Sequence, residues 1–177
     1  ILIYPSAKRW FNYPQAILAF CWGFAVLIPW AATEASSFPS DKGLIELLLK
    51  GGWPLLGVWL ATILWTFGFD TVYALADKED DQNLGLRSSA ISLRSNVMSV
   101  VAMSYAFSCI AFAVSAAFQR VGWIFWPIWF LAFISMQFET FKLKRSNCPK
   151  SAYGKHFHMQ VCIGALLLTG LVLGRSF

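Results

Sequence analysis

The stretch that decides the fold is residues 96–118, NVMSVVAMSYAFSCIAFAVSAAF, which contains no Asp, Glu, Lys or Arg. A helix needs about 20 predominantly apolar residues to cross the hydrocarbon core of a bilayer, and this stretch is long enough. Its apolar residues do not alternate with polar ones, as they would in a membrane-spanning strand. Residues 96–118 therefore predict a membrane-spanning α-helix.

Four further apolar segments of the same kind flank this one. They lie at approximately Ala16–Ala32, Trp53–Phe69, Gly122–Gln137 and Phe157–Gly174. Each is close to the lower limit of about 17 residues for a spanning helix, and each can extend into its flanks. We therefore expect an all-α, polytopic transmembrane helical bundle with about five spanning helices, which forms a single domain over residues 1–177. A short amphipathic piece is expected at Leu44–Leu49.

The composition of the chain supports a place in a lipid bilayer. Hydrophobic residues make up 58% of the sequence and charged residues only 13%, against about 25% charged residues in soluble domains. The net charge of +5 does not indicate nucleic-acid binding, because Lys and Arg of membrane proteins gather in cytoplasmic loops. The four cysteines form no CxxC pair, and we expect free thiols.

An acidic run follows the second apolar segment and holds five of the nine acidic residues: Asp70, Asp77, Glu79, Asp80 and Asp81. If the run continues that helix or begins a new one, Asp70, Asp77 and Asp81 share one face within about 40°, with Tyr73 and Asp80 beside them. Carboxylates one turn apart repel, and a divalent cation would remove this repulsion. Because Mg²⁺ is bound by one or two carboxylates together with substrate phosphates, the run predicts a magnesium site for a phosphate-bearing substrate.

Two other interpretations of the acidic run stay open. It is compatible with a solvated acidic loop that follows a membrane helix. A calcium or cation-transport site fits less well, because the carboxylates lie at the end of the span and not at mid-membrane.

Two basic stretches accompany the acidic run. Residues 85–90, GLRSSA, place Arg87 and Ser88 directly after it, and residues 4–9, YPSAKR, contain Lys8 and Arg9. Arg binds phosphate through two parallel hydrogen bonds, and hydroxyl groups can complete such a site. The alternative is that both stretches only anchor their helices at the membrane surface.

The distribution of Lys and Arg predicts the orientation of the bundle. The acidic-run side has ten: Lys8, Arg9, Lys78, Arg87, Arg94, Lys142, Lys144, Arg145, Lys150 and Lys155. The other side has four: Lys42, Lys50, Arg120 and Arg175. This asymmetry favours a cytoplasmic location of the acidic run.

The motifs together resemble one family. The run Asp70-x-x-Tyr73-Ala74-x-x-Asp77-x-x-Asp80-Asp81 and the following Gly85–Ala90 are similar to the second aspartate-rich motif of the UbiA-type intramembrane prenyltransferases, most of all the 4-hydroxybenzoate polyprenyltransferases of quinone biosynthesis. Tyr4-Pro5-x-x-Lys8-Arg9 with Pro14-Gln15 resembles a family loop, and Phe157-x-x-Gln160-x-x-x-Gly164 resembles a weaker pattern in which Asn is usual at the place of Gln160.

The resemblance implies an activity and a site. It implies an integral multi-pass protein of the bacterial inner (plasma) membrane that transfers a polyprenyl group from polyprenyl diphosphate to 4-hydroxybenzoate with Mg²⁺, in the ubiquinone or plastoquinone pathway. Its implied residues are Asp70, Tyr73, Asp77 and Asp81 for catalysis, Asp77, Asp80 and Asp81 for the metal, and Lys8, Arg9, Arg87 and Ser88 for the diphosphate or the aromatic carboxylate.

One element of the family pattern is missing from the sequence. We find no first aspartate-rich motif, so we expect the chain to be a later portion of the family fold that is inactive alone. The alternatives are a relative that acts on homogentisate or a naphthoate, and a transporter or other non-enzymatic membrane protein with an acidic cytoplasmic loop.

Overall fold

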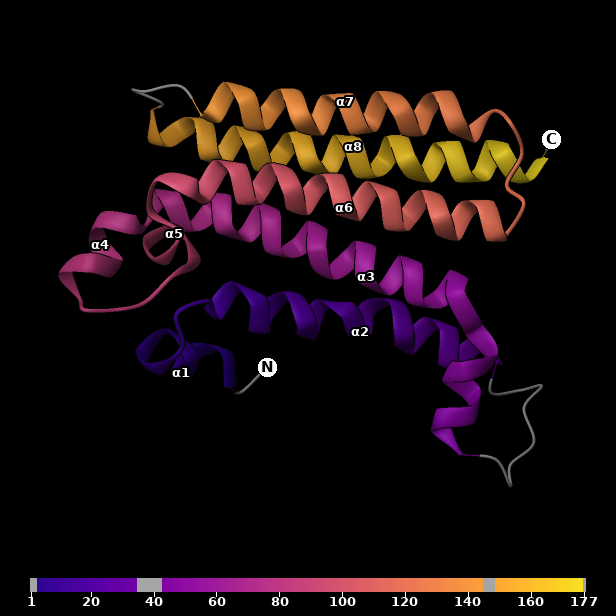
Figure 1. The fold of residues 1–177 in the computed structure, drawn as a ribbon, viewed down its shortest axis with the longest axis horizontal. Coiled ribbons are helices and arrows are strands. Elements are labelled where there is room, and N and C mark those ends of the chain that lie inside the picture. Colours follow the sequence, from indigo (N-terminus) through magenta and orange to yellow (C-terminus); the bar gives the residue numbers. More distant parts are fainter. Residues whose placement is uncertain (1–2, 35–42, 145–148, 177) are drawn as a thin grey trace.

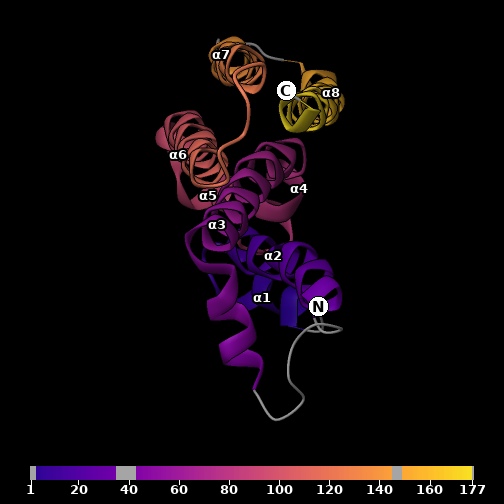
Figure 2. The same cartoon turned by 90° about the vertical axis from the view of Figure 1, so that its right-hand side faces the viewer.

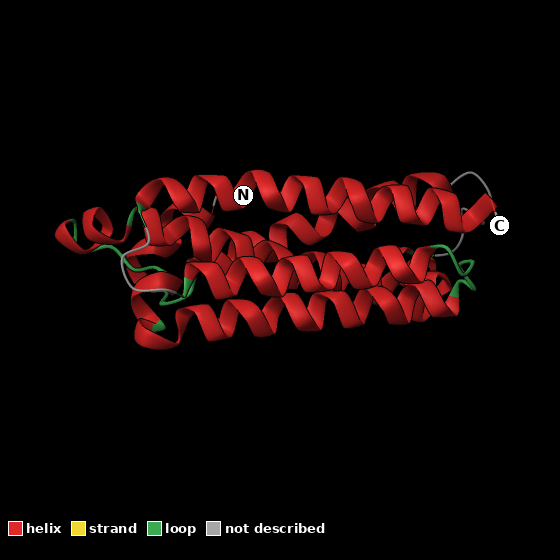
Figure 3. Ribbon diagram, turned by 90° about the horizontal axis from the view of Figure 1, so that it is seen from above, coloured by secondary structure: helices red, strands yellow, loops and turns green. Residues whose placement is uncertain are grey.

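Five long helices run in alternating directions along one axis in the computed structural model, which describes residues 3–34, 43–144 and 149–176 (Figure 1). They are α2 (Pro14–Glu34), α3 (Leu44–Ala76), α6 (Val97–Phe118), α7 (Phe125–Leu143) and α8 (Lys150–Ser176). Four short elements lie at one end of the bundle: α1 (Ile3–Trp10), α4 (Lys78–Asn83), α5 (Ser89–Ser92) and the 3₁₀ helix η2 (Arg94–Asn96). The described residues contain no strand (Figure 3), which confirms the all-α prediction.

Four described helices are long and apolar enough to cross a membrane: Pro14–Glu34, Ile45–Ala76, Arg94–Phe118 and Lys150–Arg175. They correspond to the first, second, third and fifth predicted segments. The fourth predicted segment forms α7, which is not among these four helices and has Gln137, Glu139 and Lys142 in its last two turns. Among the described residues, four helices thus qualify as spans by length and composition, against about five expected, and α7 lies beside them (Figure 2).

Helix α3 lies in the middle of the bundle and packs against α2, α6 and α8 (Figure 2). Two serines of α6 tie it to α3: the Ser108 hydroxyl donates to the carbonyl of Ala61 at 2.7 Å, and the Ser115 hydroxyl to that of Pro54 at 2.6 Å. Such interhelical bonds join membrane helices, whose apolar side chains gain little by leaving lipid for one another. Buried side chains of α3, α6, α7 and α8 form the core.

The first two turns of α3 form an arm that leaves the bundle axis (Figure 1). The bend lies at Gly52, whose φ of 56° and ψ of −152° are not helical and suit a residue without a side chain. The arm contains a helix at the predicted Leu44–Leu49, while its amphipathic character stays a prediction, because Ile45 and Leu49 are both exposed. Cys21, Cys109 and Cys162 are free thiols as expected, and Cys148 lies outside the described residues.

The contact between α3 and α6 gives a stability prediction. A Cβ atom at Gly57 would lie 2.9 Å from the carbonyl oxygen of Ala111 and 3.0 Å from Ser115 Cβ, so Gly57→Ala must push the two helices apart. We expect a loss of about 1–3 kcal/mol, as for other overpacked cores. Gly154→Ala is the matched control, because a Cβ there meets nothing within 4 Å. Thermal unfolding in detergent that ranks Gly57→Ala as the more stable variant would contradict this packing.

Candidate functional site at the acidic end of the bundle

The acidic run forms the end of one helix and the first four residues of another. Helix α3 ends at Ala76, Asp77 has φ −94° and ψ 2°, and α4 begins at Lys78. The backbone N–H of Asp81 donates to the carbonyl of Asp77 at 2.8 Å. The run therefore does not continue as one helix across Asp77, and Asp77 and Asp81 lie one turn apart at the start of α4.

The structure brings Asp81 together with Lys8, although 73 residues separate them. The ammonium nitrogen of Lys8 lies 3.1 and 3.2 Å from the two carboxylate oxygens of Asp81. The Asp81 side chain is 7% exposed and that of Lys8 is 26% exposed. A buried carboxylate is costly unless it is paired, so this ion pair is a main link between α1 and α4.

Asp70 and Tyr4 lie beside this ion pair. Asp70 is half-buried in α3, and one of its carboxylate oxygens, Oδ2, is buried without a hydrogen-bond partner among the described residues. Burial, followed by the negative charges of Asp70 and Asp81, raises the pKa of Tyr4 to about 12. Sequence analysis did not assign Tyr4 to the site, although its motif contained the signal.

Four other predicted site residues lie closer to solvent. Asp77 is half-buried at the junction of α3 and α4, and Tyr73, Asp80 and Arg9 are exposed. Their accessibility leaves them able to contact a ligand that approaches this end of the bundle.

Arg87 joins the α4–α5 loop to the connection between α1 and α2. Its guanidinium nitrogen Nη1 donates to the carbonyl of Trp10 at 2.8 Å and to Asn12 Oδ1 at 3.0 Å. Its backbone N–H donates to the carbonyl of Lys8 at 2.7 Å. Arg87 therefore helps to hold Lys8 opposite Asp81. The guanidinium group has five N–H donors, and these two side-chain hydrogen bonds do not use all of them.

Ser88 caps the short helix α5. Its hydroxyl accepts a hydrogen bond from the backbone N–H of Ile91 at 3.3 Å, and the side chain is fully buried. The next backbone N–H, of Ser89, donates to Gln15 Oε1 at 2.7 Å. Gln15 is another residue that sequence analysis did not assign; it fixes the start of α2 against α5.

Glu79 lies on the solvent side of α4 and pairs with Lys150 at the start of α8, with 2.9 Å between Oε2 and Nζ. The hydrogen bond and the charge of Lys150 lower the pKa of Glu79. Both side chains are largely exposed, so this pair contributes little to stability.

The donor set fits magnesium only in part. Within residues 3–34, 43–144 and 149–176, no group of three or more His, Cys, Asp or Glu side chains converges as a metal site. Carboxylate oxygens are nonetheless what Mg²⁺ prefers, and one or two of them suffice when substrate phosphates and water supply the rest. Asp70 Oδ2, which is buried without a hydrogen-bond partner among the described residues, is one oxygen that could join such an incomplete shell.

The raised pKa of Tyr4 predicts a pH effect. A tyrosine in an unfolded chain ionises near pH 10, whereas folded Tyr4 stays protonated to about pH 12. The stabilisation that Tyr4 gives by remaining protonated is therefore complete below about pH 10 and is lost as the pH rises towards 12. The difference in phenolate absorbance between the wild type and Tyr4→Phe should show a midpoint near 12; a midpoint near the ordinary value of about 10 would place Tyr4 in water.

Comparisons with known proteins give the family. The model of the UbiA prenyltransferase family matches residues 1–161. A 4-hydroxybenzoate solanesyltransferase of Synechocystis is 34% identical over 174 residues, which cover 98% of this chain and 55% of the relative. A 4-hydroxybenzoate octaprenyltransferase of Polynucleobacter necessarius is 30% identical, with 97% of this chain and 54% of the relative covered.

These matches agree with the motifs from which the resemblance was inferred. The chain spans about half the length of these curated relatives. No solved structure matches it. Because the family model covers most of the chain, the chain belongs to the UbiA prenyltransferase family.

Proposed function

We propose that the chain forms part of an enzyme that transfers a polyprenyl group from polyprenyl diphosphate to the ring of 4-hydroxybenzoate. The observation that carries the proposal is the pairing of Lys8 with the buried Asp81 beside Asp70. It places a cation and carboxylates together at the end of an apolar bundle, as a metal–diphosphate substrate with a lipid tail requires. The names of the relatives support 4-hydroxybenzoate as the acceptor.

Asp77, Asp80 and Asp81 would hold Mg²⁺ in this proposal, with Asp70 in support. When bound, the metal neutralises the diphosphate and makes it a better leaving group. Lys8, Arg9 and Arg87 would bind the diphosphate oxygens or the carboxylate of the acceptor. The exposed Tyr73 and the protonated Tyr4 would donate hydrogen bonds. The full burial of Ser88 favours a role in shaping the α4–α5 loop.

The reaction forms one carbon–carbon bond and breaks two bonds, the C–O bond to diphosphate and one C–H bond of the ring. The ring carbon beside the phenol hydroxyl attacks the allylic carbon, diphosphate leaves, and the proton of that ring carbon passes to the released diphosphate or to water. An open, mostly apolar groove between α3 and α8, lined in part by Trp65, Phe69 and Phe157, suits the prenyl chain. Apolar walls keep water from the allylic cation, and aromatic faces stabilise it.

The proposed orientation puts the acidic end in the cytoplasm of a bacterium, with the helices in its inner membrane. In Figure 1, α1, α4, α5 and the start of α8 lie at that same end. These elements and the α4–α5 loop bring Lys8, Arg9, Lys78, Arg87 and Lys150 there, in agreement with the positive-inside rule. Lys42 and Arg145, which contributed to the charge count, lie outside the described residues.

The test uses a chimera in which this chain replaces the matching 174 residues of the Synechocystis relative. Membranes that contain it are incubated with solanesyl diphosphate and labelled 4-hydroxybenzoate. We expect labelled product that disappears with EDTA and returns with Mg²⁺. Turnover of homogentisate or a naphthoate in place of 4-hydroxybenzoate would show that the acceptor is a different aromatic compound. A folded chimera without any turnover would reject the proposal.

A transporter with an acidic loop remains the alternative outside the enzymes. Transporters place ionisable side chains at mid-membrane, whereas the described acidic residues of this chain lie towards the helix ends. A proton or cation flux through vesicles that contain the wild-type chain, and that Asp81→Asn abolishes, would favour this alternative.

A further inference from the structure

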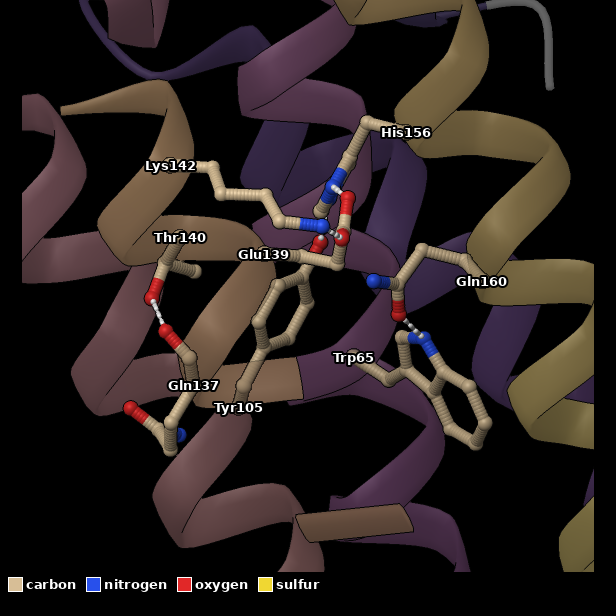
Figure 4. A network of polar contacts seen from close by, with 8 residues as sticks. All are labelled: Trp65, Tyr105, Gln137, Glu139, Thr140, Lys142, His156 and Gln160. Carbon is tan, nitrogen blue, oxygen red and sulfur yellow. Dashed lines mark hydrogen bonds and ion pairs between the residues drawn. The ribbon is translucent and has the colours of Figure 1, made fainter. Parts of the chain in front are cut away.

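A polar network lies inside the bundle, apart from the acidic cluster. Figure 4 shows Tyr105 of α6, Glu139 of α7 and His156 of α8 meeting between their helices. The Tyr105 hydroxyl lies 2.8 Å from His156 Nε2, and both side chains are fully buried, at 0% and 1% exposure. Glu139 Oε2 lies 4.0 Å from His156 Nδ1, and its other oxygen pairs with Lys142 at 2.8 Å.

Burial makes the Tyr105–His156 hydrogen bond important. Removing one partner leaves the other as a polar group in an apolar interior, where it costs more than the bond itself contributes. Neither side chain reaches the surface, so neither can contact a substrate in this arrangement. A role in placing another part of the chain is what their position allows.

The ring of Tyr105 contacts α3 at Gly68, two residues before Asp70. A Cβ atom at Gly68 would lie 2.5 Å from Tyr105 Cε1 and 2.9 Å from Cδ1, so the ring rests on the backbone of Gly68. Gly68 precedes Asp70 by two residues. The position of the Tyr105 ring therefore sets how closely the last turns of α3 approach α6.

Helix α8 also contacts α3 directly, one turn after His156. Gln160 follows His156 by four residues, and its Oε1 accepts a hydrogen bond from Trp65 Nε1 at 2.8 Å (Figure 4). Trp65 precedes Gly68 by three residues on α3. Two successive turns of α8 thus fix two successive turns of α3, one directly and one through Tyr105.

We propose that Tyr105 and His156 are positioning residues whose hydrogen bond fixes the last two turns of α3 and so places Asp70 and Asp77 at the acidic end. In the enzyme this placement sets the affinity for the metal–diphosphate group. This second statement rests on the proposed function, whereas the first concerns the chain alone.

Hydrogen–deuterium exchange of the purified chain tests the first statement without any turnover. Tyr105→Phe and His156→Leu each leave one partner buried and unpaired. We expect the amides of residues 69–77 to exchange about tenfold faster in both variants, with residues 55–62 unchanged. His156→Gln should stay close to the wild type, because its side-chain amide can accept a bond from the Tyr105 hydroxyl.

Ser108→Ala is the matched control. Ser108 is a buried residue of the same helix that also bonds to α3, but at Ala61, nine residues before Asp70. It should leave exchange at residues 69–77 unchanged. An equal rise with Ser108→Ala, a rise spread evenly over the bundle, or no rise at 69–77 in Tyr105→Phe would overturn the proposal. If His156→Leu fails to fold, Tyr105→Phe and His156→Gln still decide it.

The chimera tests the second statement. Tyr105→Phe should raise the Mg²⁺ concentration for half-maximal activity and the KM for solanesyl diphosphate about tenfold, with the KM for 4-hydroxybenzoate within about twofold. A fall in kcat alone, with both parameters unchanged, would contradict it. A wild-type chimera without turnover would reject the proposed function, while the exchange experiment would still decide the positioning role.

Discussion

Asp81→Ala in the chimera is expected to lower kcat by roughly 10³-fold. A metal held at a phosphoryl oxygen contributes several kcal/mol to the transition state, and each factor of ten in rate corresponds to about 1.4 kcal/mol. Asp81 is also the buried partner of Lys8, so the variant releases a cation from its position in the site. The measurement is kcat at saturating Mg²⁺ and solanesyl diphosphate. Asp77→Ala should behave similarly, because Asp77 lies one turn before Asp81.

Glu79→Ala provides the control for this prediction. It removes a carboxylate from the same helix, but that carboxylate is 74% exposed and pairs with Lys150 on the solvent side. We expect kcat within about twofold of the wild type, as for most surface substitutions. Equal losses in Glu79→Ala and Asp81→Ala would show that the acidic run acts only through its total charge, as a solvated loop would.

The helices could be predicted because a membrane-spanning helix requires a long apolar stretch, which is visible in the sequence itself. A span must satisfy its backbone hydrogen bonds internally and must be apolar over its length, so residues 96–118 could hardly form anything else. At Gly122–Gln137 the apolar stretch is shorter, because the last turns of α7 contain polar residues, so its length alone does not predict a span. The bend at Gly52 depends on a single residue at the edge of an apolar run, and apolar length does not encode it.

The site was predictable as a set of residues but not as a set of contacts. The motifs put Lys8, Asp81 and Arg87 into one site, yet no local pattern shows that Lys8 pairs with Asp81 or that Arg87 bonds to Trp10. Such contacts depend on how α1 folds back onto the α4–α5 loop. Tyr105 was missed because a polar residue inside an apolar run has no periodicity, and its partner His156 lies on another helix, directly before the apolar segment Phe157–Gly174.

The Lys8–Asp81 pair allows stability and chemistry to be separated. Lys8→Met leaves the Asp81 carboxylate buried and unpaired, and we expect a loss of about 1–3 kcal/mol, below the range for a fully buried pair because Lys8 is 26% exposed. When Asp81→Asn is added to Lys8→Met, it removes the negative charge that Lys8→Met leaves buried without a partner. The double variant should therefore be more stable than the sum of the two single changes predicts, with a coupling of about 1–2 kcal/mol.

The activity of the double variant should not recover with its stability. The neutral amide that Asp81→Asn introduces cannot supply the negative charge for the metal, so kcat should stay as low as in Asp81→Asn alone. Thermal unfolding in detergent measures the coupling, and the chimera assay measures kcat. The exposed pair Glu79–Lys150, changed to Gln and Met, should show no measurable coupling. If Lys8 and Asp81 also show none, α1 is not held against α4 in the folded protein; if kcat recovers, the carboxylate serves structure alone.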